Sequence, residues 1–323
     1  MIRHEWRDEL TGDEFAAVRE LVVTAAAYDA DAGFAVLDGD GIRAAPPGRR
    51  VWHLPVTARE RLGGPGAPWV HVAHLRLVVD ADGQGTVGYT VHPEYRSRGI
   101  TTLLVEELGL DIAGPAGWCG TGATALRCWA YGTHPAAQRL TRRFGIRPAA
   151  RLWTLLRPLT GPFAAPLDDL PVPDGFVVAP ADTGDTARIE ALAARSVTGV
   201  HAERFAADFA DRHGRILLAT RDGRDAGFAW FDPGPAPHAE WTAGRIKALM
   251  VAPAARGLGL GSALLTRALH EVAAGGAQVA LLRVDPDERA AVRMCRLRSF
   301  EQEQAHTCYD IGKWATPPEF ASA

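Results

Sequence analysis

The segment from Arg256 to Ser262, with the sequence RGLGLGS, places one arginine and three glycines directly before a helix-like apolar stretch. The first turn of a helix has backbone N–H groups without partners inside the helix and carries a partial positive charge, so it attracts anions. Glycine lets an anion approach the main chain, and arginine adds a charge-assisted donor. We therefore predict a phosphate-binding loop formed by Arg256, Gly257, Leu258, Gly259, Leu260, Gly261 and Ser262.

The same arrangement occurs earlier in the chain, in the segment VHPEYRSRGITTLLVEEL from Val91 to Leu108. Both copies have the pattern of a strand end, a proline-marked turn, a basic loop and an amphipathic helix. The register is constant, and the matching pairs are Val91 with Val251, Pro93 with Pro253, Arg96 with Arg256 and Gly99 with Gly259. A repeat of this kind implies two homologous domains.

The two loops differ at their last position, where the first has Thr101 and the second has Gly261. A β-branched side chain does not remove the N–H donors, but it narrows the approach of a pyrophosphate. We therefore expect the second loop to be the stronger anion site.

The length of 323 residues is sufficient for two hydrophobic cores of ordinary size. The stretch 159–174 is rich in proline and has little periodicity, as is typical of a linker. We therefore expect an N-terminal domain over 1–158, this linker, and a C-terminal domain over 175–323. The order of elements in each half predicts an α/β fold with a mixed sheet.

Apolar periodicity predicts regular elements in both halves, with helices over 14–28, 186–197 and 202–213 and strands over 69–80, 86–91 and 245–251. The stretch 38–66 is rich in glycine, proline and arginine, so we expect an irregular loop on the substrate side. A second proline-rich loop is expected to end at Gly244.

Composition excludes several classes of function. The formal net charge of −3 provides no global basic field for nucleic acid or an anionic membrane, so neither DNA nor a membrane is an expected partner. The chain starts with charged residues and lacks a run of about 18 apolar residues, which a membrane span needs. The four cysteines lack metal-ligand spacing and indicate reduced thiols, so we expect a cytoplasmic protein without a metal.

The pattern Arg-x-x-Gly-x-Gly in 256–261 resembles the acyl-CoA pyrophosphate loop of the GCN5-related N-acetyltransferase (GNAT) superfamily. It lacks the spacing of the dinucleotide fingerprint and the lysine of the nucleotide-binding P-loop. Further stretches resemble mycothiol synthase, a tandem two-domain branch of this superfamily, namely VHPEYRSRGI, CWAYGTHPAA, RRFGIRPAARLWTLLRPL, PVPDG, GFAWF and AVRMCRLRSF.

This resemblance implies two tandem GNAT domains and acetyl-CoA, or another acyl-CoA, as the cofactor. In that branch the C-terminal half carries the reaction, and the N-terminal half binds acetyl-CoA without evident turnover. The acetyl group goes to the cysteinyl amine of a thiol precursor. The resemblance also implies that the thioester carbonyl lies against the main chain of Leu249, Met250 and Val251.

The sequence departs from the family pattern where chemistry is expected. Arg245 occupies the position of the glutamate that often serves as the base, and an arginine cannot accept a proton at neutral pH. Cys295 occupies the position of the tyrosine acid, and Ser299 that of the glycine four residues later. The family also has a histidine where this chain has Ala229, and a polar residue where it has Phe231. These departures argue against mycothiol itself as the product.

Three residues are candidates for the missing base. Glu240 precedes the strand that contains Arg245, although a solvated loop carboxylate is the commoner meaning of such a residue. Asp285 ends a strand that faces the acyl channel in this fold, although aspartate before proline also suits a helix N-cap. His201 lies between two predicted helices near the expected acceptor pocket, where it could equally be a surface histidine.

Two hypotheses of function follow. The first is an acyltransferase that moves an acyl group from acyl-CoA, acetyl-CoA by default, to the amine of a small metabolite. A carrier-protein thioester or an aminoacyl-tRNA is an alternative donor, which a row of arginines could dock if it is not simply a solvated face: Arg139, Arg142, Arg143, Arg147 and Arg151. The second hypothesis is a protein that binds acyl-CoA without turnover.

Overall fold

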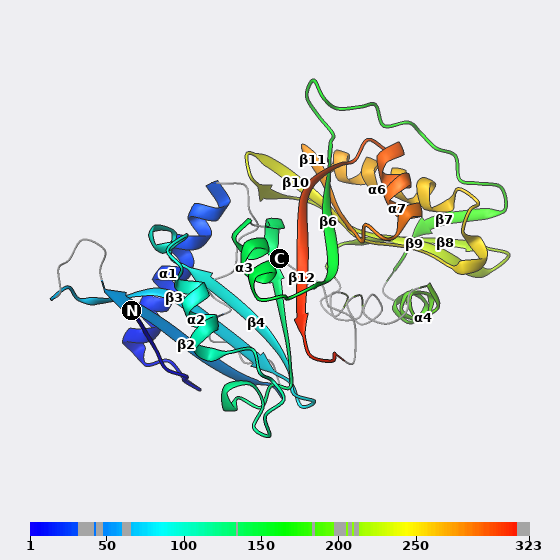
Figure 1. The fold of residues 1–323 in the computed structure, drawn as a ribbon. Helices are drawn as coiled ribbons and strands as arrows, with labels where there is room; N and C mark the ends of the chain where they lie inside the picture. Colours follow the sequence, from blue (N-terminus) through cyan, green and yellow to red (C-terminus); the bar gives the residue numbers. More distant parts are fainter. Residues whose placement is uncertain are drawn as a thin grey trace. The chain divides into compact units, whose positions relative to one another are not determined.

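The apolar runs of the sequence form strands of mixed sheets whose faces are covered by helices (Figure 1). This arrangement is seen in a computed structural model that describes residues 1–31, 42, 48–59, 66–133, 135–182, 185–196, 205, 209 and 213–314.

The chain divides into two compact units that do not coincide with the two halves of the sequence. Strand β6 (Pro148–Pro158) ends the first half but pairs with β11 (Val279–Val284) of the second unit. Strand β12 (Glu301–Ile311) ends the second half, and from Thr307 it pairs with β5 (Ala125–Ala130) of the first unit. Each unit therefore completes its sheet with the last strand of the other half. The expected boundary at 158/159 follows the sequence repeat, which carries no information on this exchange.

In the first unit, the strand order is β1-β2-β3-β4-β5-β12, with β4 and β5 parallel and the other neighbouring strands antiparallel. Helices α1 and α2 lie on opposite faces of this sheet (Figure 1). The remaining elements of this unit are β1 (Ile2–His4), α1 (Gly12–Asp31), β2 (Arg50–Arg59), β3 (Trp69–Val79), β4 (Gln84–Val91), α2 (Ile100–Leu108) and α3 (Pro135–Arg143).

Strand β2 corrects the expectation of an irregular loop over 38–66. Residues Arg50–Arg59 pair with β1 on one side and with β3 on the other. Residues 53–56 are all buried, and Leu54 and Val56 share one face as the two-residue period of a strand requires. The surrounding glycines, prolines and arginines conceal this short pattern. The rest of the expected loop lies largely outside the described residues.

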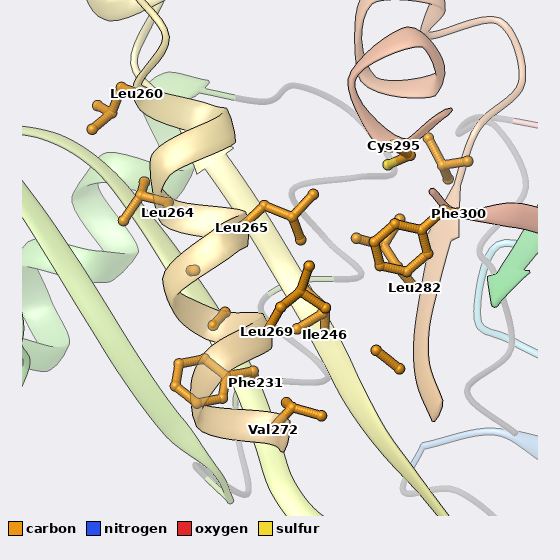
Figure 2. Close-up of a cluster of buried hydrophobic side chains, with 14 of the residues drawn as sticks. Phe231, Ile246, Leu260, Leu264, Leu265, Leu269, Val272, Leu282, Cys295 and Phe300 are labelled. Carbon is orange, nitrogen blue, oxygen red and sulfur yellow. The ribbon is translucent and has the colours of Figure 1, made fainter. Parts of the chain in front are cut away.

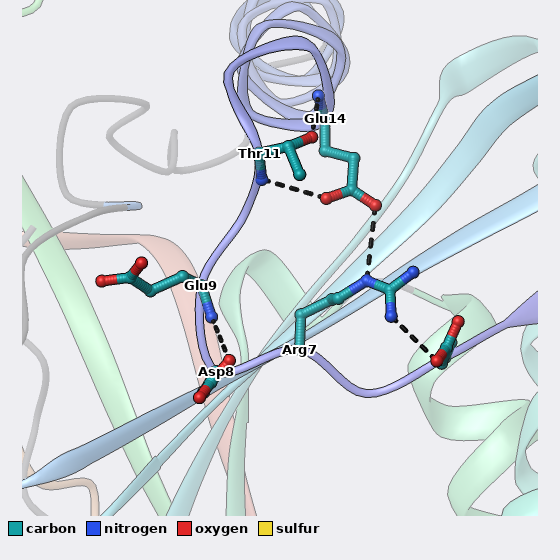
Figure 3. Close-up of polar contacts among 6 residues, drawn as sticks. Arg7, Asp8, Glu9, Thr11 and Glu14 are labelled. Atoms are coloured by element: carbon teal, nitrogen blue, oxygen red, sulfur yellow. Dashed lines mark hydrogen bonds and ion pairs between the residues drawn. The ribbon is translucent and has the colours of Figure 1, made fainter.

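Helix α1 begins with a capping box (Figure 3). The Glu14 N–H donates to Thr11 Oγ1 at 3.3 Å, and the Thr11 N–H donates to Glu14 Oε2 at 3.0 Å. These two bonds satisfy donors that a helix start leaves without partners. The Thr11 backbone N–H and, to a smaller extent, the Arg7 side chain hold the pKa of Glu14 below its usual value.

Beneath α1, the first unit buries His53 and His74, whose Nδ1 and Nε2 atoms lie 3.2 Å apart. Burial lowers the pKa of His53 to about 4 and that of His74 to about 3. A buried histidine with a lowered pKa is neutral at physiological pH, and its protonation in acid opposes folding.

In the second unit, the strand order is β6-β11-β10-β9-β8-β7, with β10 and β11 parallel. Helices α6 and α7 cover one face and α4 the other (Figure 1). The apolar side of α6 packs on the sheet through Leu264, Leu265 and Leu269, together with Phe231 and Ile246 of the strands (Figure 2). The remaining elements are β7 (Phe176–Pro180), α4 (Thr186–Ser196), β8 (Arg215–Arg221), β9 (Arg224–His238), β10 (Trp241–Val251), α6 (Leu260–Ala274) and α7 (Arg289–Leu297).

The proline-rich loop expected to end at Gly244 is instead a long hairpin. Strands β9 and β10 pair up to His238 and Trp241, so the turn contains only Ala239 and Glu240. Pro233 and Pro235 lie at the register shift between Ala243 and Arg245, where interruptions of the ladder are tolerated, and Pro237 stays in register opposite Thr242. The helix expected over 202–213 lies largely outside the described residues.

No helix among the described residues combines the length and apolar character that a membrane crossing would require.

The capping box leads to a pH-dependent prediction. Because the folded pKa of Glu14 is lowered, its stabilising contribution is present above the unfolded pKa and is lost as the pH falls through the folded value. Glu14→Ala should lower the free energy of unfolding by about 1 kcal/mol at pH 7 and by less at pH 3.5. Urea titrations measure this difference, with the exposed Glu9→Ala as the matched control. Equal losses at both pH values would contradict the prediction.

Candidate active site

A gap between two parallel strands lies at the centre of the second unit. Strands β10 and β11 pair from Ala243 with Val279 to Ile246 with Leu282, and the pairing stops there. Both strands continue, because β10 keeps its pairing with β9 up to Val251, and β11 keeps its pairing with β6 up to Val284. The carboxyl ends of β10 and β11 therefore separate and leave one edge of each strand without a strand partner.

The main chain of β10 presents hydrogen-bonding groups to this gap. The Ala252 N–H donates to Ala226 O of β9 at 2.8 Å. In an antiparallel pair every second residue makes such bonds, so the N–H and C=O groups of Met250 are also directed toward β9. Leu249 and Val251 consequently direct their N–H and C=O groups to the opposite side, where β11 has moved away. They are two of the three positions predicted to lie against an acyl thioester, whereas the main chain of the third, Met250, is directed toward β9 and away from the gap.

A β-bulge lies just before these residues in β10. Ile246 is opposite Phe231 and Ala248 is opposite Trp230, so Lys247 is an extra residue on β10. Bulges of this kind are common beside active sites, because they bend the strand and redirect a side chain. Lys247 Nζ donates to His213 O at 3.0 Å and lies 4.5 Å from the centroid of the Trp230 ring.

The loop after β10 has the geometry of an anion cradle. Gly257 and Gly259 have φ values of 76° and 84°, a region that favours glycine. Gly259 is the N-cap of α6 and provides no side-chain cap, so the N–H groups of the first turn remain directed outward. A Cβ on Gly261 would lie 3.4 Å from Met294 Sδ and 3.6 Å from Val251 Cγ2, which shows how closely the cradle approaches its neighbours. The residues at this loop therefore fit the pyrophosphate of an acyl-CoA.

Arg256 holds this loop in place through the main chain. Its Nε donates to Val251 O at 3.2 Å, and its Nη2 donates to the carbonyl of Ser196 at the end of α4 at 2.5 Å. Carbonyl acceptors leave the positive charge of the guanidinium uncompensated, so it still favours an anion nearby. The arginine predicted as a direct ligand thus acts first as a clamp between the loop, β10 and α4.

The first unit contains the equivalent loop, which leaves less space for a ligand. Gly99 is again the N-cap of its helix, with a φ of 78°, and Arg96 Nε again donates to Val91 O, at 3.1 Å. Here, however, the Arg96 guanidinium is paired with the carboxylate of Asp29. The alignment of the repeats also replaces Leu249 by Tyr89, whose hydroxyl is buried.

Tyr89 and Thr101 enlarge the side chains on both sides of this first loop. Burial raises the pKa of Tyr89 to about 12, with a smaller opposing effect of the neighbouring Thr101 hydroxyl. In addition, β3 and β4 pair in a continuous register over Gly85–Val91, so the counterpart of the Lys247 bulge is missing from this strand pair. The two loops share a backbone but differ in the space available to a ligand.

The structure separates the three candidate bases. Asp285 comes three residues after the last β10–β11 pair and lies at the open end of the gap, where its Oδ1 accepts the Asp287 N–H at 2.8 Å. Glu240 lies in the exposed β9–β10 turn, at the opposite end of β10 and about 30 Å along the strand from Leu249. His201 lies outside the described residues.

The structure shows the surroundings of Cys295 and Arg245, the residues that the resemblance aligned with the family acid and base. Cys295 on α7 is buried in the core, and burial raises the pKa of its thiol to about 12, so it is a poor proton donor (Figure 2). Ser299 has a φ of 58°, close to the 67° of Gly145 in the first repeat, so the backbone of the family glycine is kept with a serine. Arg245 is exposed on the face of β10 opposite Ile246, the same face as Lys247.

Ala229 and Phe231, two of the departures that argued against mycothiol as the product, lie in the core. Ala229 and Phe231 are buried beneath α6, whereas Phe228 and Trp230 alternate to the face covered by α4. Ala229 and Phe231 thus alter the packing under the cofactor helix, and sequence alone could not assign them to a face because both neighbours are also apolar.

The predicted arginine row is divided between the two units, because Arg151 belongs to the second and the others to the first. Arg143 pairs with Glu106 at 2.7 Å, and Arg151 lies 3.8 Å from Asp287. Local carboxylates therefore compensate two members of the row, Arg143 and Arg151.

Sequence reasoning missed the bulge at Lys247 and the contact of Lys247 with Trp230. The only available signal was the pair of basic residues Arg245 and Lys247 in an otherwise apolar strand. Such a pattern indicates an exposed strand face, but it does not show where a ladder shifts.

Comparison with known protein families matches residues 185–300 to the Acetyltransferase (GNAT) family. A mycothiol acetyltransferase of a Nocardioides species is 31% identical over 317 residues, which cover 88% of this chain and 92% of that protein. A mycothiol acetyltransferase of Salinispora tropica is 32% identical over 319 residues, which cover 94% and 95% of the two chains.

Solved structures share the fold along the whole chain. A GCN5-related N-acetyltransferase from Sphaerobacter thermophilus has a TM-score of 0.65 at 18% identity and covers 98% of this chain and 97% of its own. A tandem GNAT protein from the clavulanic acid biosynthesis pathway has a TM-score of 0.62 at 18% identity, with 99% and 100% covered. The predicted GNAT resemblance and tandem fold are confirmed.

Burial of Cys295 predicts selective thiol labelling. Among the four free cysteines, Cys119 is exposed, Cys128 is intermediate, and Cys295 and Cys308 are buried. A thiol reagent at pH 8 should modify Cys119 in the folded protein and leave Cys295 intact, because reactivity requires an accessible thiolate. Mass spectrometry of labelled peptides measures this, and labelling in urea provides the control. Rapid labelling of Cys295 in the folded state would contradict its assignment to the core.

Proposed function

Because this chain belongs to the GNAT acetyltransferase family, a family of N-acyltransferase enzymes, we propose that its second unit transfers an acetyl group from acetyl-CoA to the amine of a small metabolite. The observation that carries the proposal is the gap between β10 and β11, where the main chain of Leu249 and Val251 has no strand partner, with the glycine cradle next to it. The family match over 185–300 supports the second unit in particular, because it covers this gap and its cradle.

The chain binds the cofactor mainly through its backbone. The N–H groups of Gly257 to Ser262 would hold the pyrophosphate, favoured by the partial charge at the start of α6 and by Arg256. The N–H groups of Leu249 and Val251 would orient the acyl end. When bound, acetyl-CoA supplies a thioester whose carbonyl carbon an amine can attack. Fixed N–H groups in such a position favour the transition state because they need no reorganisation.

The acceptor amine must lose a proton, and Asp285 is the carboxylate that we propose for this step. It is the one of the three sequence candidates that lies at the gap among the described residues. Its Oδ1 accepts the Asp287 N–H at 2.8 Å, which fixes the orientation of the carboxylate at the end of β11. A CoA thiolate is a modest base and can leave without an acid, which is compatible with the burial of Cys295.

The acceptor side of β10 favours a particular class of amine. Arg245 and Lys247 project from the same face of the strand, and Lys247 is fixed by His213 O and the Trp230 ring. Asp232 is opposite Arg245 in the ladder, so Lys247 is the cation on which an acceptor with an acidic group besides its amine would depend most. We include this acidic amine class in the proposed function. The departures at Ala229 and Phe231 add little to the choice of acceptor, because both side chains are in the core.

The proposed function is tested by measuring the release of the CoA thiol from acetyl-CoA in the presence of a panel of amines. The amines are chosen in pairs whose two members differ only by a carboxylate or a phosphate group. The panel includes the acceptor of the mycothiol acetyltransferases. We expect turnover with an acidic amine and little with its neutral partner. Parallel reactions with a carrier-protein thioester and an aminoacyl-tRNA test the alternative donors. Binding of acetyl-CoA without release for any acceptor would instead support a protein that only binds acyl-CoA.

The two loops provide a matched test of the cofactor site. Gly259→Asp and Gly99→Asp place the same charge and the same backbone strain at equivalent N-caps. The first should weaken acetyl-CoA binding by about tenfold or more, or about 1.4 kcal/mol, because the carboxylate repels a pyrophosphate. The second should leave the affinity unchanged. Isothermal titration calorimetry measures both, and equal losses would show that the cofactor does not select the second loop.

The role of Asp285 is tested by Asp285→Asn, which keeps an oxygen for the Asp287 N–H but cannot accept a proton. We expect kcat to fall by about 10²-fold with KM for acetyl-CoA little changed, and the loss to shrink at high pH where the amine is already neutral. The exposed Asp287→Asn is the control. A kcat equal to that of the unaltered enzyme at neutral pH would exclude Asp285 as the base.

A further inference from the structure

A group of hydrogen-bond donors without acceptors lies on the α6–α7 side of the second unit, away from the cradle. It consists of Arg157 Nε on β6, Arg298 Nε directly after α7 and Thr266 Oγ1 on α6. Within the described part of the chain, all three atoms are buried and lack a hydrogen-bond partner. The same three residues line one cavity of about 30 Å³, together with the linker residues Pro166, Leu167 and Asp168.

The donors are held rigidly. The Arg157 guanidinium donates to the Arg298 carbonyl and, from Nη2, to the carbonyls of Ala165 and Pro166 at 2.9 and 3.0 Å. Arg157 is only 3% exposed and Thr266 only 2%. Neither side chain can therefore turn to water to satisfy its remaining donor, and a buried donor without an acceptor is costly.

The charge around the cavity is unbalanced. Arg157 and Arg298 are both cationic, and the nearby carboxylate of Asp168 is 74% exposed with its Oδ2 3.9 Å from Arg298 Nη1. Burial, and next to it the charge of Arg298, lowers the pKa of Arg157, but an arginine remains protonated in a protein. Arg157 is buried and Arg298 half-buried, and two neighbouring cations in such surroundings repel each other unless a negative group comes between them.

We propose that this cavity is a binding site for a small inorganic anion of the size of chloride, held by Arg157 Nε, Arg298 Nε and Thr266 Oγ1. A monoatomic anion accepts all three hydrogen bonds and offsets the repulsion of the two guanidinium groups. A single water of similar size can accept two hydrogen bonds and supplies no charge.

The position of the site indicates what the anion does. Arg157 also binds the linker carbonyls at 165 and 166, so the anion would join the linker to α6 and to the end of α7. Thr266 comes six residues after Leu260, about 9 Å along the axis of α6, so the anion site is distinct from the pyrophosphate cradle. We therefore expect the anion to stabilise the second unit without competing with acetyl-CoA.

Thermal unfolding of the full chain tests the proposal. Sodium chloride should raise the melting temperature with a saturable dependence, whereas sodium gluconate at the same ionic strength should not. Arg298→Gln should weaken the apparent chloride affinity by about tenfold or more. Thr266→Val, which removes only the hydroxyl, should weaken it less, and Arg296→Gln, an exposed neighbour on α7, should leave it unchanged. Equal stabilisation by the two salts would overturn the proposal.

Crystals grown in sodium bromide provide a direct readout. We expect an anomalous peak within hydrogen-bond distance of the three donors in the unaltered protein and its absence in Arg298→Gln. An ordered water in place of bromide in the unaltered protein would refute an anion site. Both experiments are independent of enzyme turnover, so they can succeed or fail whatever the acceptor is.

Discussion

The separation of β10 from β11 after Ile246 and Leu282 is the constraint on which the site depends. Paired strands would hide the main chain of Leu249 and Val251 in the ladder. Two sets of contacts keep the strands apart: β10 remains with β9 up to Val251, and β11 remains with β6 up to Val284. Because β6 comes from the first half of the sequence, the exchange of the last strands supplies the partner that holds one side of the gap.

The apolar contacts of α6 then fix the cradle relative to this gap. Leu260, Leu264 and Leu265 are almost fully buried against the sheet, so the helix start cannot move independently of the strand ends (Figure 2). Arg256 adds a polar link from the loop to Val251 and to the end of α4. The proposed cofactor site is thus built mostly from backbone that buried leucines hold in place.

The two repeats illustrate how one backbone serves different purposes. Both have a left-handed glycine at the N-cap, and both have an arginine that donates to the carbonyl of the preceding strand. In the first, Asp29 compensates the arginine, and Tyr89 with Thr101 occupies more of the space beside the loop. The second keeps smaller side chains at these positions and adds the bulge at Lys247. Conservation of the loop backbone therefore identifies the fold, and the neighbouring side chains decide which copy can hold a large anion.

The sequence by itself determined the local features: the repeat, the cradle with its left-handed glycines, the main helices and the tandem GNAT fold. These depend on residues close together in the chain, such as Gly259 before an apolar helix. Only the tertiary structure decided the exchange of β6 and β12, the shift at Lys247, the distance of Glu240 from the gap and the meeting of Arg157, Thr266 and Arg298. The physical reason is that strand edges offer equivalent hydrogen bonds to many partners, so pairing is chosen by long-range packing.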